Sequence, residues 1–390
     1  MSFMLSLDTI VMARKSLVFY FTLIVLSANC QQSVKHSGKQ DGDGIKTGSL
    51  AESGLDSTII HRVDTAVANG TYPNIHSVLI ARHNKLVYEK YWPGKDQDWG
   101  THLGMTAHGQ DSLHDIRSIS KSIVSACAGI AIQQGKIKSV EQRVFDFFPE
   151  HSKYDTGIKS LLTIKHLLTM SSGLAWNEDV PYDNPENSEI RMTRSPDVVE
   201  YVLSQPMDFP PGKVWKYNGG TTQLLAAIIQ KTTGEKIDQF AKKYLFDALG
   251  VKRFEWRKYP GTDLPAAASG VRLRSRDLLK FGLLYANNGK WGDKQIISGQ
   301  WIKESFQAHI ARPGAQRSSG SYGYQFWLWQ DTLRNQLTSI VACVGNGDQR
   351  IFIDQTRDMI IVITAGNYNN WTITKNSSAL VKDYIYAALK

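Results

Sequence analysis

The spacing of hydrophobic residues changes twice along the chain, from the alternation typical of strands to helical periodicity and back again. Apolar residues alternate over 77–81 and 85–91, which predicts two strands joined by a tight turn into a hairpin. A helical pattern over 57–69 precedes this hairpin, and the Gly- and His-containing stretch 93–114 that follows it is predicted to be a loop.

The middle of the chain shows helical spacing, and the last part returns to strands. Helices are predicted over 164–170, 195–203, 222–232, 237–249 and 274–287, with Pro196 at the first position of the second helix. Strands are predicted over 322–330, 338–344, 349–354 and 359–364, and a closing helix over 377–389. This order indicates an α+β fold, in which one central antiparallel sheet from both chain ends is flanked by helices and an all-helical region is inserted. A cleft between sheet and insertion is the natural place for a site.

The segment 115–130 carries the first candidate chemistry and is predicted to be helical. Its apolar residues share one helical face: Ile119, Ile123, Ala126, Cys127 and Ile130. Ser118 and Lys121 are three apart and therefore lie one turn from each other on the same side. Free N–H groups at a helix start favour negative charge, and a desolvated lysine loses its proton readily. Ser118 and Lys121 are thus a candidate nucleophile and base, with an ordinary solvated lysine as the alternative.

Composition and charge narrow the classes of function. The 390 residues, of which 42% are hydrophobic, are enough for one large folded domain. The formal net charge of +9 is modest, because acidic residues are scattered among the lysines and arginines, and no basic run interleaves with aromatic residues. Nucleic acid is therefore not an expected partner.

No His/Cys cluster has zinc-ligand spacing, and neither a His-Glu-x-x-His motif nor a glycine-rich phosphate loop occurs. We therefore expect no metal and no cofactor. Cys127 and Cys343 are expected to be small buried apolar residues, and whether they pair stays open.

The N-terminus predicts export, with an uncleaved N-terminal anchor as the alternative. Arg14 and Lys15 precede an apolar run, 16–28, that is too short to span a bilayer and fits a signal-peptide core. Cys30 lies where a lipid-modified cysteine would, so a periplasmic protein, a membrane-tethered lipoprotein and a secreted protein all stay open. Three segments are therefore expected: 1–30 as a signal peptide or lipoprotein signal, 31–55 as a flexible polar linker, and 56–390 as the folded domain.

Several short motifs, taken in order, resemble those of one family. They are RSISKS at 117–122, LLTMSSGL at 167–174, Pro211-Gly212, Tyr217-Asn218-Gly219-Gly220, Leu224-Leu225, SGVRLRSRD at 269–277 and GNGDQ at 345–349. Over about residues 57–390 the chain resembles serine hydrolases of the class C β-lactamase and penicillin-recognising group, closest to the esterase and 6-aminohexanoate-dimer hydrolase branch. The resemblance implies a β-lactamase-like fold and a serine hydrolase that cleaves small-molecule ester, amide or peptide-like substrates through an acyl-enzyme.

The resemblance also implies roles for three side chains. Ser118 is expected to be the acylated nucleophile and Lys121 its proton-transfer partner. Tyr217 matches the tyrosine of the second motif, whose phenol or phenolate relays protons with the lysine. A lysine ammonium beside this phenol is expected to lower its pKa, because the positive charge stabilises the anion.

The third motif, at Gly345, Asn346 and Gly347, is expected to complete an oxyanion hole. Backbone N–H groups of Ser118 and Asn346 would face the oxygen of the tetrahedral intermediate, where each such donor contributes roughly 3 kcal/mol. A simple hairpin turn is the alternative for these positions. Asn218 and Trp176 complete the predicted substrate-binding set. Further candidates for an aromatic cleft wall are Tyr182, Trp215, Tyr322, Tyr324 and Trp327.

Two departures from the family pattern bear on the substrate. The second motif is often Tyr-x-Asn, and here its third position is Gly219. The third motif often begins with Lys or His, and here it begins with Gly345. Because the lysine of that strand helps to hold the β-lactam carboxylate in true β-lactamases, strong lactam hydrolysis is not expected. The alternatives to an esterase or amidase are a penicillin-binding or D-aminopeptidase-like protein, a weak β-lactamase, and a non-catalytic binding protein of the same fold.

Overall fold

The computed structural model describes residues 42–312, 320–333 and 336–390. The predicted signal segment, 1–30, and the first part of the predicted linker lie outside these ranges. Within the described ranges, no helix is both long enough and apolar enough to cross a bilayer.

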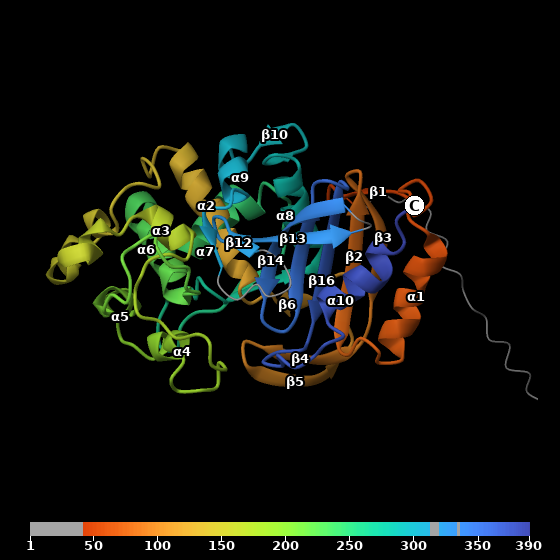
Figure 1. The fold of residues 1–390 in the computed structure, drawn as a ribbon, viewed down its shortest axis with the longest axis horizontal. Coiled ribbons are helices and arrows are strands. Elements are labelled where there is room, and N and C mark those ends of the chain that lie inside the picture. The colour runs from red at the N-terminus through yellow and green to blue at the C-terminus, as the bar shows by residue number, and fades with distance from the viewer. Residues whose placement is uncertain (1–41, 313–319, 334–335) are drawn as a thin grey trace, which may run out of the picture. The chain divides into compact units, whose positions relative to one another are not determined.

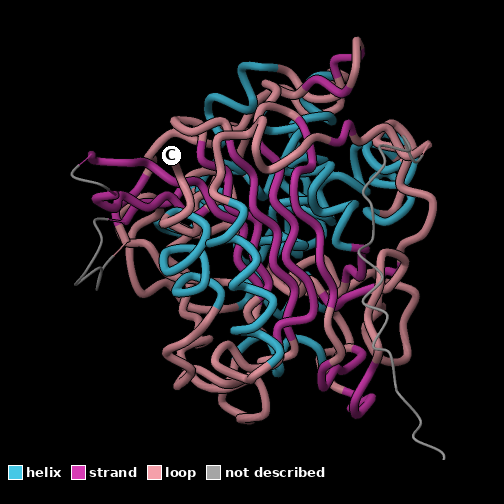
Figure 2. The backbone as a smooth tube through the Cα atoms, turned by 90° about the vertical axis from the view of Figure 1, so that its right-hand side faces the viewer, coloured by secondary structure: helices cyan, strands magenta, loops and turns pink. Residues whose placement is uncertain are grey.

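A nine-stranded sheet forms the centre of the folded body (Figures 1 and 2). In spatial order its strands are β1 (Lys46–Thr47), β3 (Lys85–Tyr91), β2 (Ile75–Arg82), β16 (Met359–Ala365), β15 (Gln349–Asp354), β14 (Gln336–Gly345), β13 (Trp327–Leu333), β12 (Gly320–Tyr322) and β11 (Ile310–Ala311). Neighbouring strands are antiparallel except for β1 and β3, which are parallel. The early strand β2 pairs with the last strand, β16, so both chain ends share one sheet. The predicted α+β architecture is confirmed.

Helices cover both faces of the sheet, and the alternation along β2 shows how the faces differ. Val78 and Ile80 belong to a core that includes residues of α1 (Ser57–Ala68) and of the C-terminal helix α10 (Ser377–Leu380), which continues as the π-helical turn Val381–Tyr386. Leu79 and Ala81 belong to a second core, which includes residues of α8 (Ser275–Ala286) and α2 (Ile119–Gln133). All four side chains are fully buried, as expected for a strand that is covered on both faces.

The inserted region is helical, as predicted, and lies beside the sheet (Figure 1). Its helices are α3 (Ile164–Leu168), α4 (Ser188–Thr193), α5 (Val198–Ser204), α6 (Gly219–Thr233) and α7 (Ile237–Ala241), with the π-helical turn Lys242–Phe246 and the 3-10 helices Val144–Phe147, Pro149–Tyr154 and Gly157–Leu161. A further helix, α9 (Gly299–Ser305), follows α8. The helix predicted over 195–203 begins at Val198, because the Asp197 carboxylate caps its first N–H groups and Pro196 precedes the cap.

The prediction of a loop over 93–114 is wrong. This stretch contains a hairpin of β4 (Gly94–Asp98) and β5 (Thr101–Thr106), followed by the strand β6 (Leu113–Asp115). β5 is exposed over most of its length, so the hairpin carries no apolar alternation that a sequence pattern could detect. β6 joins β8 (Val271–Arg274) and β7 (Glu255–Trp256) in a separate small sheet, and β9 (Lys290–Trp291) pairs with β10 (Lys294–Gln295).

The predicted flexible linker is wrong for residues 42–55, the part that the structure describes. Ile45 and Leu55 are buried in the two cores, and β1 adds to the edge of the central sheet. The Asp43 carboxylate forms an ion pair with Arg276 on α8. A few isolated apolar and charged contacts therefore hold this polar stretch against the body.

Candidate active site

Ser118, the predicted nucleophile, lies where β6 turns into α2. β6 ends at Asp115 and α2 begins at Ile119, so the helix starts later than predicted and Ser118 occupies the position before its first residue. Arg117 adopts a positive φ of 49°, which is uncommon for a non-glycine residue and turns the chain sharply. The buried Asp115 carboxylate holds this turn by accepting the Trp99 N–H and pairing with Arg117.

Lys121 is aimed at Ser118 from inside the protein. Its Nζ lies 3.1 Å from the Ser118 Oγ and donates a second hydrogen bond to the Ala268 carbonyl oxygen at 3.0 Å. The side chain is 1% exposed, so it is not the solvated surface lysine of the alternative interpretation. Ser118 and Lys121, which the sequence spacing predicted to be neighbours, are therefore in contact, and two hydrogen bonds hold the lysine side chain in place.

Tyr217 comes from the segment that leads into α6 and joins this pair. The Lys121 Nζ lies 4.9 Å from the centroid of its ring. Burial raises the pKa of the phenol well above its usual value, the negative charge of Glu178 adds to the rise, and the interaction with the Ser118 hydroxyl opposes it. The expected lowering of the Tyr217 pKa is therefore wrong in direction, and the resting side chain is a neutral phenol.

Two acidic residues near Tyr217, Glu178 and Glu189, were not predicted from the sequence. Glu178 accepts hydrogen bonds from the Trp176 Nε1 at 2.6 Å, the Gly219 N–H at 2.5 Å and the Tyr182 hydroxyl at 3.1 Å. Burial and the nearby charge of Glu189 raise the pKa of Glu178 to about 7. The two carboxyl groups form an acidic pair next to the proposed proton-transfer residues.

This acidic pair explains the first departure from the family pattern. A Cβ at Gly219 would lie 2.5 Å from the Glu189 Oε2 and 2.9 Å from the Glu178 Oε1. A side chain at the third position of the motif would therefore collide with both carboxyl groups. Glu189 also accepts a hydrogen bond from the Ser269 hydroxyl at 2.9 Å, which ties the pair to the segment preceding β8.

The third motif is a hairpin turn between β14 and β15, in which Gly345 pairs with Gln349. The turn also reaches the site, because Asn346 lines the same two cavities as Ser118. The Asn346 side chain donates to the Asn369 Oδ1 at 2.6 Å and accepts the Asn369 N–H at 2.9 Å. Gly347 has a φ of 89°, which favours glycine in this turn. The segment is thus a hairpin turn that also borders the cavities at Ser118, and its part in an oxyanion hole stays a prediction.

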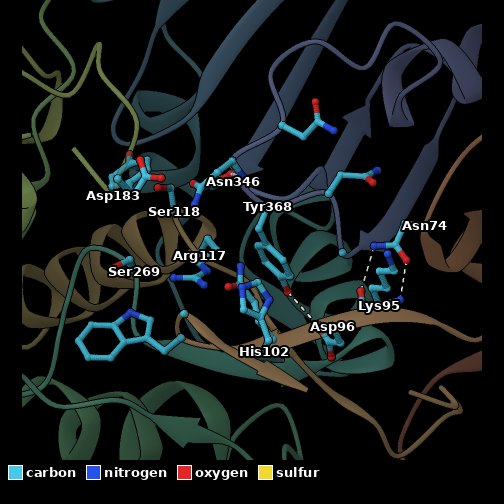
Figure 3. A pocket seen from close by; sticks show the side chains of 18 of the residues that line it. Asn74, Lys95, Asp96, His102, Arg117, Ser118, Asp183, Ser269, Asn346 and Tyr368 are labelled. Carbon is cyan, nitrogen blue, oxygen red and sulfur yellow. Dashed lines mark hydrogen bonds between the residues drawn. The ribbon is translucent and has the colours of Figure 1, made fainter. Parts of the chain in front are cut away.

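Two cavities meet at Ser118, one of about 970 Å³ and one of about 320 Å³. Ser118, Tyr182, and Asn346 line both of them. The larger cavity also contains Arg117, Asp183, Ser269 and Tyr368, which Figure 3 shows around Ser118. The smaller cavity has an aromatic wall of Trp215, Tyr217 and Trp327, and it also contains Gly345 and Gly347.

Four other residues that were predicted to face the substrate do not line either cavity in the described part of the chain. They are Trp176, Asn218, Tyr322 and Tyr324. Trp176 is 3% exposed, packs edge-to-face with Tyr201 and holds Glu178 through its indole N–H. Asn218 is buried and caps α6 by accepting the Thr221 N–H at 3.1 Å. Neither side chain is among the residues that line the two cavities, and the expectation that they bind substrate stays a prediction. Tyr322 and Tyr324 are likewise buried, and Cys127 and Cys343 are free, buried thiols.

The sequence model of the family described as Beta-lactamase matches residues 55–375. The chain belongs to the beta-lactamase family. Within it, the 6-aminohexanoate-dimer hydrolase of Paenarthrobacter ureafaciens is 25% identical over 270 residues, which cover 65% of this chain and 66% of that protein. Esterase EstB of Burkholderia gladioli is 24% identical over 182 residues, which cover 45% of each chain. The match therefore spans less than two thirds of either relative.

Solved structures of similar proteins share the fold of this beta-lactamase-family chain. EstCE1, described as a hydrolase with promiscuous acyltransferase activity, matches with a TM-score of 0.67 and 16% identity over 87% of this chain and 100% of its own. The predicted β-lactamase-like fold is thus confirmed. Because the curated relatives are hydrolases, the predicted class, a serine hydrolase related to β-lactamases, is confirmed at the level of the family.

Proposed function

We propose that this protein is an exported serine hydrolase that cleaves carboxylic ester or amide bonds of small molecules through an acyl-enzyme on Ser118. The observation that carries the proposal is the 3.1 Å contact between the Ser118 Oγ and the buried Lys121 Nζ, at the junction of two cavities. Relatives named 6-aminohexanoate-dimer hydrolase and esterase support hydrolysis of these bond types.

Acylation begins when the Ser118 Oγ attacks the substrate carbonyl carbon and its proton passes to the Lys121 nitrogen. The oxygen of the tetrahedral intermediate accepts hydrogen bonds from the backbone N–H groups of Ser118 and Asn346, which need no reorganisation during the reaction. Because burial keeps Tyr217 protonated, its phenol serves as the acid that protonates the departing alcohol or amine.

Deacylation uses the same groups in reverse. After the leaving group departs, Tyr217 is a phenolate beside the protonated Lys121, whose Nζ lies 4.9 Å from the centroid of the ring, and the opposite charges stabilise each other. The phenolate takes a proton from water, which attacks the acyl carbonyl, and Lys121 returns its proton to Ser118 as the acid leaves. Each proton that moved in the first half of the cycle is thereby restored.

The aromatic wall supports an apolar acyl group as substrate. The Trp215 and Trp327 rings lie 5.7 Å apart in an edge-to-face arrangement, and Tyr217 lies 5.8 Å from Trp327. These rings offer apolar area close to Ser118, where a methylene group gains about 0.8 kcal/mol on burial. Acyl chains of several carbons are therefore expected to react better than acetyl groups.

Hydrolysis of a series of p-nitrophenyl esters and p-nitroanilides tests the proposal. The wild type should release p-nitrophenol, and Ser118→Ala should lose at least 1,000-fold in kcat/KM, whereas the exposed Ser152→Ala should match the wild type. Equal turnover by Ser118→Ala would reject the nucleophile. Stable labelling by a fluorescent penicillin without ester turnover would instead favour the penicillin-binding alternative.

The N-terminal charge-then-apolar pattern supports the export part of the proposal. Expression of the full chain in a Gram-negative host, followed by fractionation and mass spectrometry of the N-terminus, tests it. Export predicts a processed chain outside the cytoplasm, and lipidation predicts an acylated N-terminal Cys30. An intact N-terminus on protein that stays in the cytoplasm would reject export.

A further inference from the structure

Three histidines and one aspartate converge at the edge of the larger cavity. His76 lies on β2, Asp96 on β4, His108 between β5 and β6, and His114 on β6. One possible ligand atom from each of the four residues lies within 4.8 Å of all the others. His76, Asp96 and His114 are at most 5% exposed, and His108 is half-buried. Three strands and the segment between β5 and β6 thus bring these side chains to one point inside the protein.

The histidine rings are packed together without hydrogen bonds between them. The His76 and His108 rings are stacked with centroids 3.8 Å apart, and the His108 and His114 centroids are 4.9 Å apart. Among the described residues, no hydrogen-bond partner is available for either nitrogen of His108 and His114 or for the Nδ1 of His76. Buried polar atoms normally have partners, so five unpartnered nitrogens at one place need an explanation.

The protonation of these rings suits metal binding. The His76 Nε2 lies 3.0 Å from the Lys95 carbonyl oxygen, which can only accept, so Nε2 carries the proton and Nδ1 keeps its lone pair. Neutral imidazoles are the form that binds metal ions.

We propose that His76, Asp96, His108 and His114 bind one divalent transition-metal ion, for which Zn²⁺ is the best fit. Three imidazole nitrogens and one carboxylate oxygen form a donor set that zinc accepts in tetrahedral geometry. A zinc ion with Zn–N bonds of about 2.0 Å would hold its donors about 3.3 Å apart, so binding would draw the four side chains inward. Four protein ligands leave no open position, which makes this a structural site separate from the Ser118 chemistry.

The surrounding contacts resemble the outer shell of a metal site. The hydrogen bond from the His76 Nε2 to the Lys95 carbonyl fixes the orientation of the ring, and the Tyr368 hydroxyl donates to the Asp96 Oδ1 at 3.2 Å. In Figure 3, Tyr368 lies between Asp96 and Arg117, and the Arg117 guanidinium lies 5.1 Å from the Tyr368 ring centroid. A metal here would fasten the β4–β5 hairpin to β2 and β6, on the side of the cavity that carries Arg117. This inference does not depend on the proposed hydrolysis.

Metal content provides the direct test. The full chain, purified with its affinity tag removed, is dialysed against a slight excess of Zn²⁺, then against metal-free buffer, and analysed by inductively coupled plasma mass spectrometry. We expect about one zinc per chain for the wild type and for His102→Gln, an exposed histidine of the same cavity that lies outside the cluster. His76→Gln and Asp96→Asn should lose at least 90% of the bound metal.

Two further measurements test the proposal even if the ligand variants fail to fold, because they use only the wild type and His102→Gln. Co²⁺ added to the wild type should give the visible absorption bands of a tetrahedral site, and Zn²⁺ should abolish them. A chelator should lower the Tm of the wild type and of His102→Gln alike. A wild type with less than 0.1 metal per chain and no cobalt bands would overturn the proposal. Equal metal content in wild type, His76→Gln and Asp96→Asn would do the same.

Discussion

The carbonyl oxygen of Ile116 lies so close to Gly345 that a Cβ at position 345 would come within 2.3 Å of it. This contact joins the end of β14 to the turn that delivers Ser118, although more than 200 residues separate the two in the sequence. It also brings Asn346 beside Ser118 in both cavities. The proposed oxyanion hole therefore depends on a glycine that permits close approach of two backbone segments.

Gly345→Ala is expected to damage catalysis more than binding. The new methyl group must push the hairpin away from the Ile116 carbonyl, which misaligns the Asn346 N–H, so kcat for a p-nitrophenyl ester should fall about 100-fold with little change in KM. Gly42→Ala is the matched control, because a Cβ there meets nothing within 4 Å. Wild-type kcat in the Gly345 variant would remove the proposed role of this hairpin.

Tyr217→Phe is expected to leave the fold intact and remove the acid of the leaving-group step. The ring keeps its packing against Trp327 and only the hydroxyl is lost, so kcat should fall by about 100- to 10,000-fold at an unchanged Tm. The deficit should be larger for anilides than for nitrophenyl esters, since an amine leaves only when it is protonated. Tyr154→Phe, at a residue that lines neither cavity, serves as the control, and equal losses in both variants would contradict the assignment.

Glu178→Gln is expected to change how stability depends on pH. The pKa of Glu178 is raised from 4.5 to about 7, so between these values the folded chain keeps a proton that the unfolded chain has released. The free energy of unfolding therefore decreases as pH rises from about 5 to about 7, by on the order of 2 kcal/mol from this pair. Urea unfolding across this range should show a flatter profile for Glu178→Gln than for the exposed control Glu52→Gln. Parallel profiles would show that the acidic pair does not hold the proton.

Trp327→Ala is expected to shorten the preferred acyl chain. In the wild type, kcat/KM should rise from p-nitrophenyl acetate to the hexanoate ester, because each buried methylene gains about 0.8 kcal/mol. Without the Trp327 ring this rise should shrink by about tenfold, while turnover of the acetate stays within a few-fold. The ratio of the two kcat/KM values is the measurement, and an unchanged ratio would place the acyl group elsewhere.

Strong local periodicity made much of the fold predictable from the sequence. The strand predicted over 349–354 matches β15, and the one over 359–364 falls one residue short of β16, because each contains a run of buried apolar residues, 351–353 and 359–363. Ser118 and Lys121 were predicted from their spacing on one helical turn, a local property that survives the later start of α2.

The parts that were missed depend on contacts between distant segments. Glu178 and Glu189 look like ordinary polar residues in the sequence, and only the fold brings both against Gly219. Trp176 looked like a cleft aromatic, but its indole is turned inward to bind Glu178. No metal was expected because the four clustered ligands, His76, Asp96, His108 and His114, have no recognisable spacing, and three of them lie in the stretch that was predicted to be a loop.

Covalent labelling tests the central claim most directly. The purified chain is treated with a fluorophosphonate probe and analysed by intact mass and peptide mapping. The account predicts one probe per chain on the peptide that contains Ser118, much slower labelling of Lys121→Ala, and none of Ser118→Ala. Labelling at another residue, or equal labelling of wild type and Ser118→Ala, would contradict it.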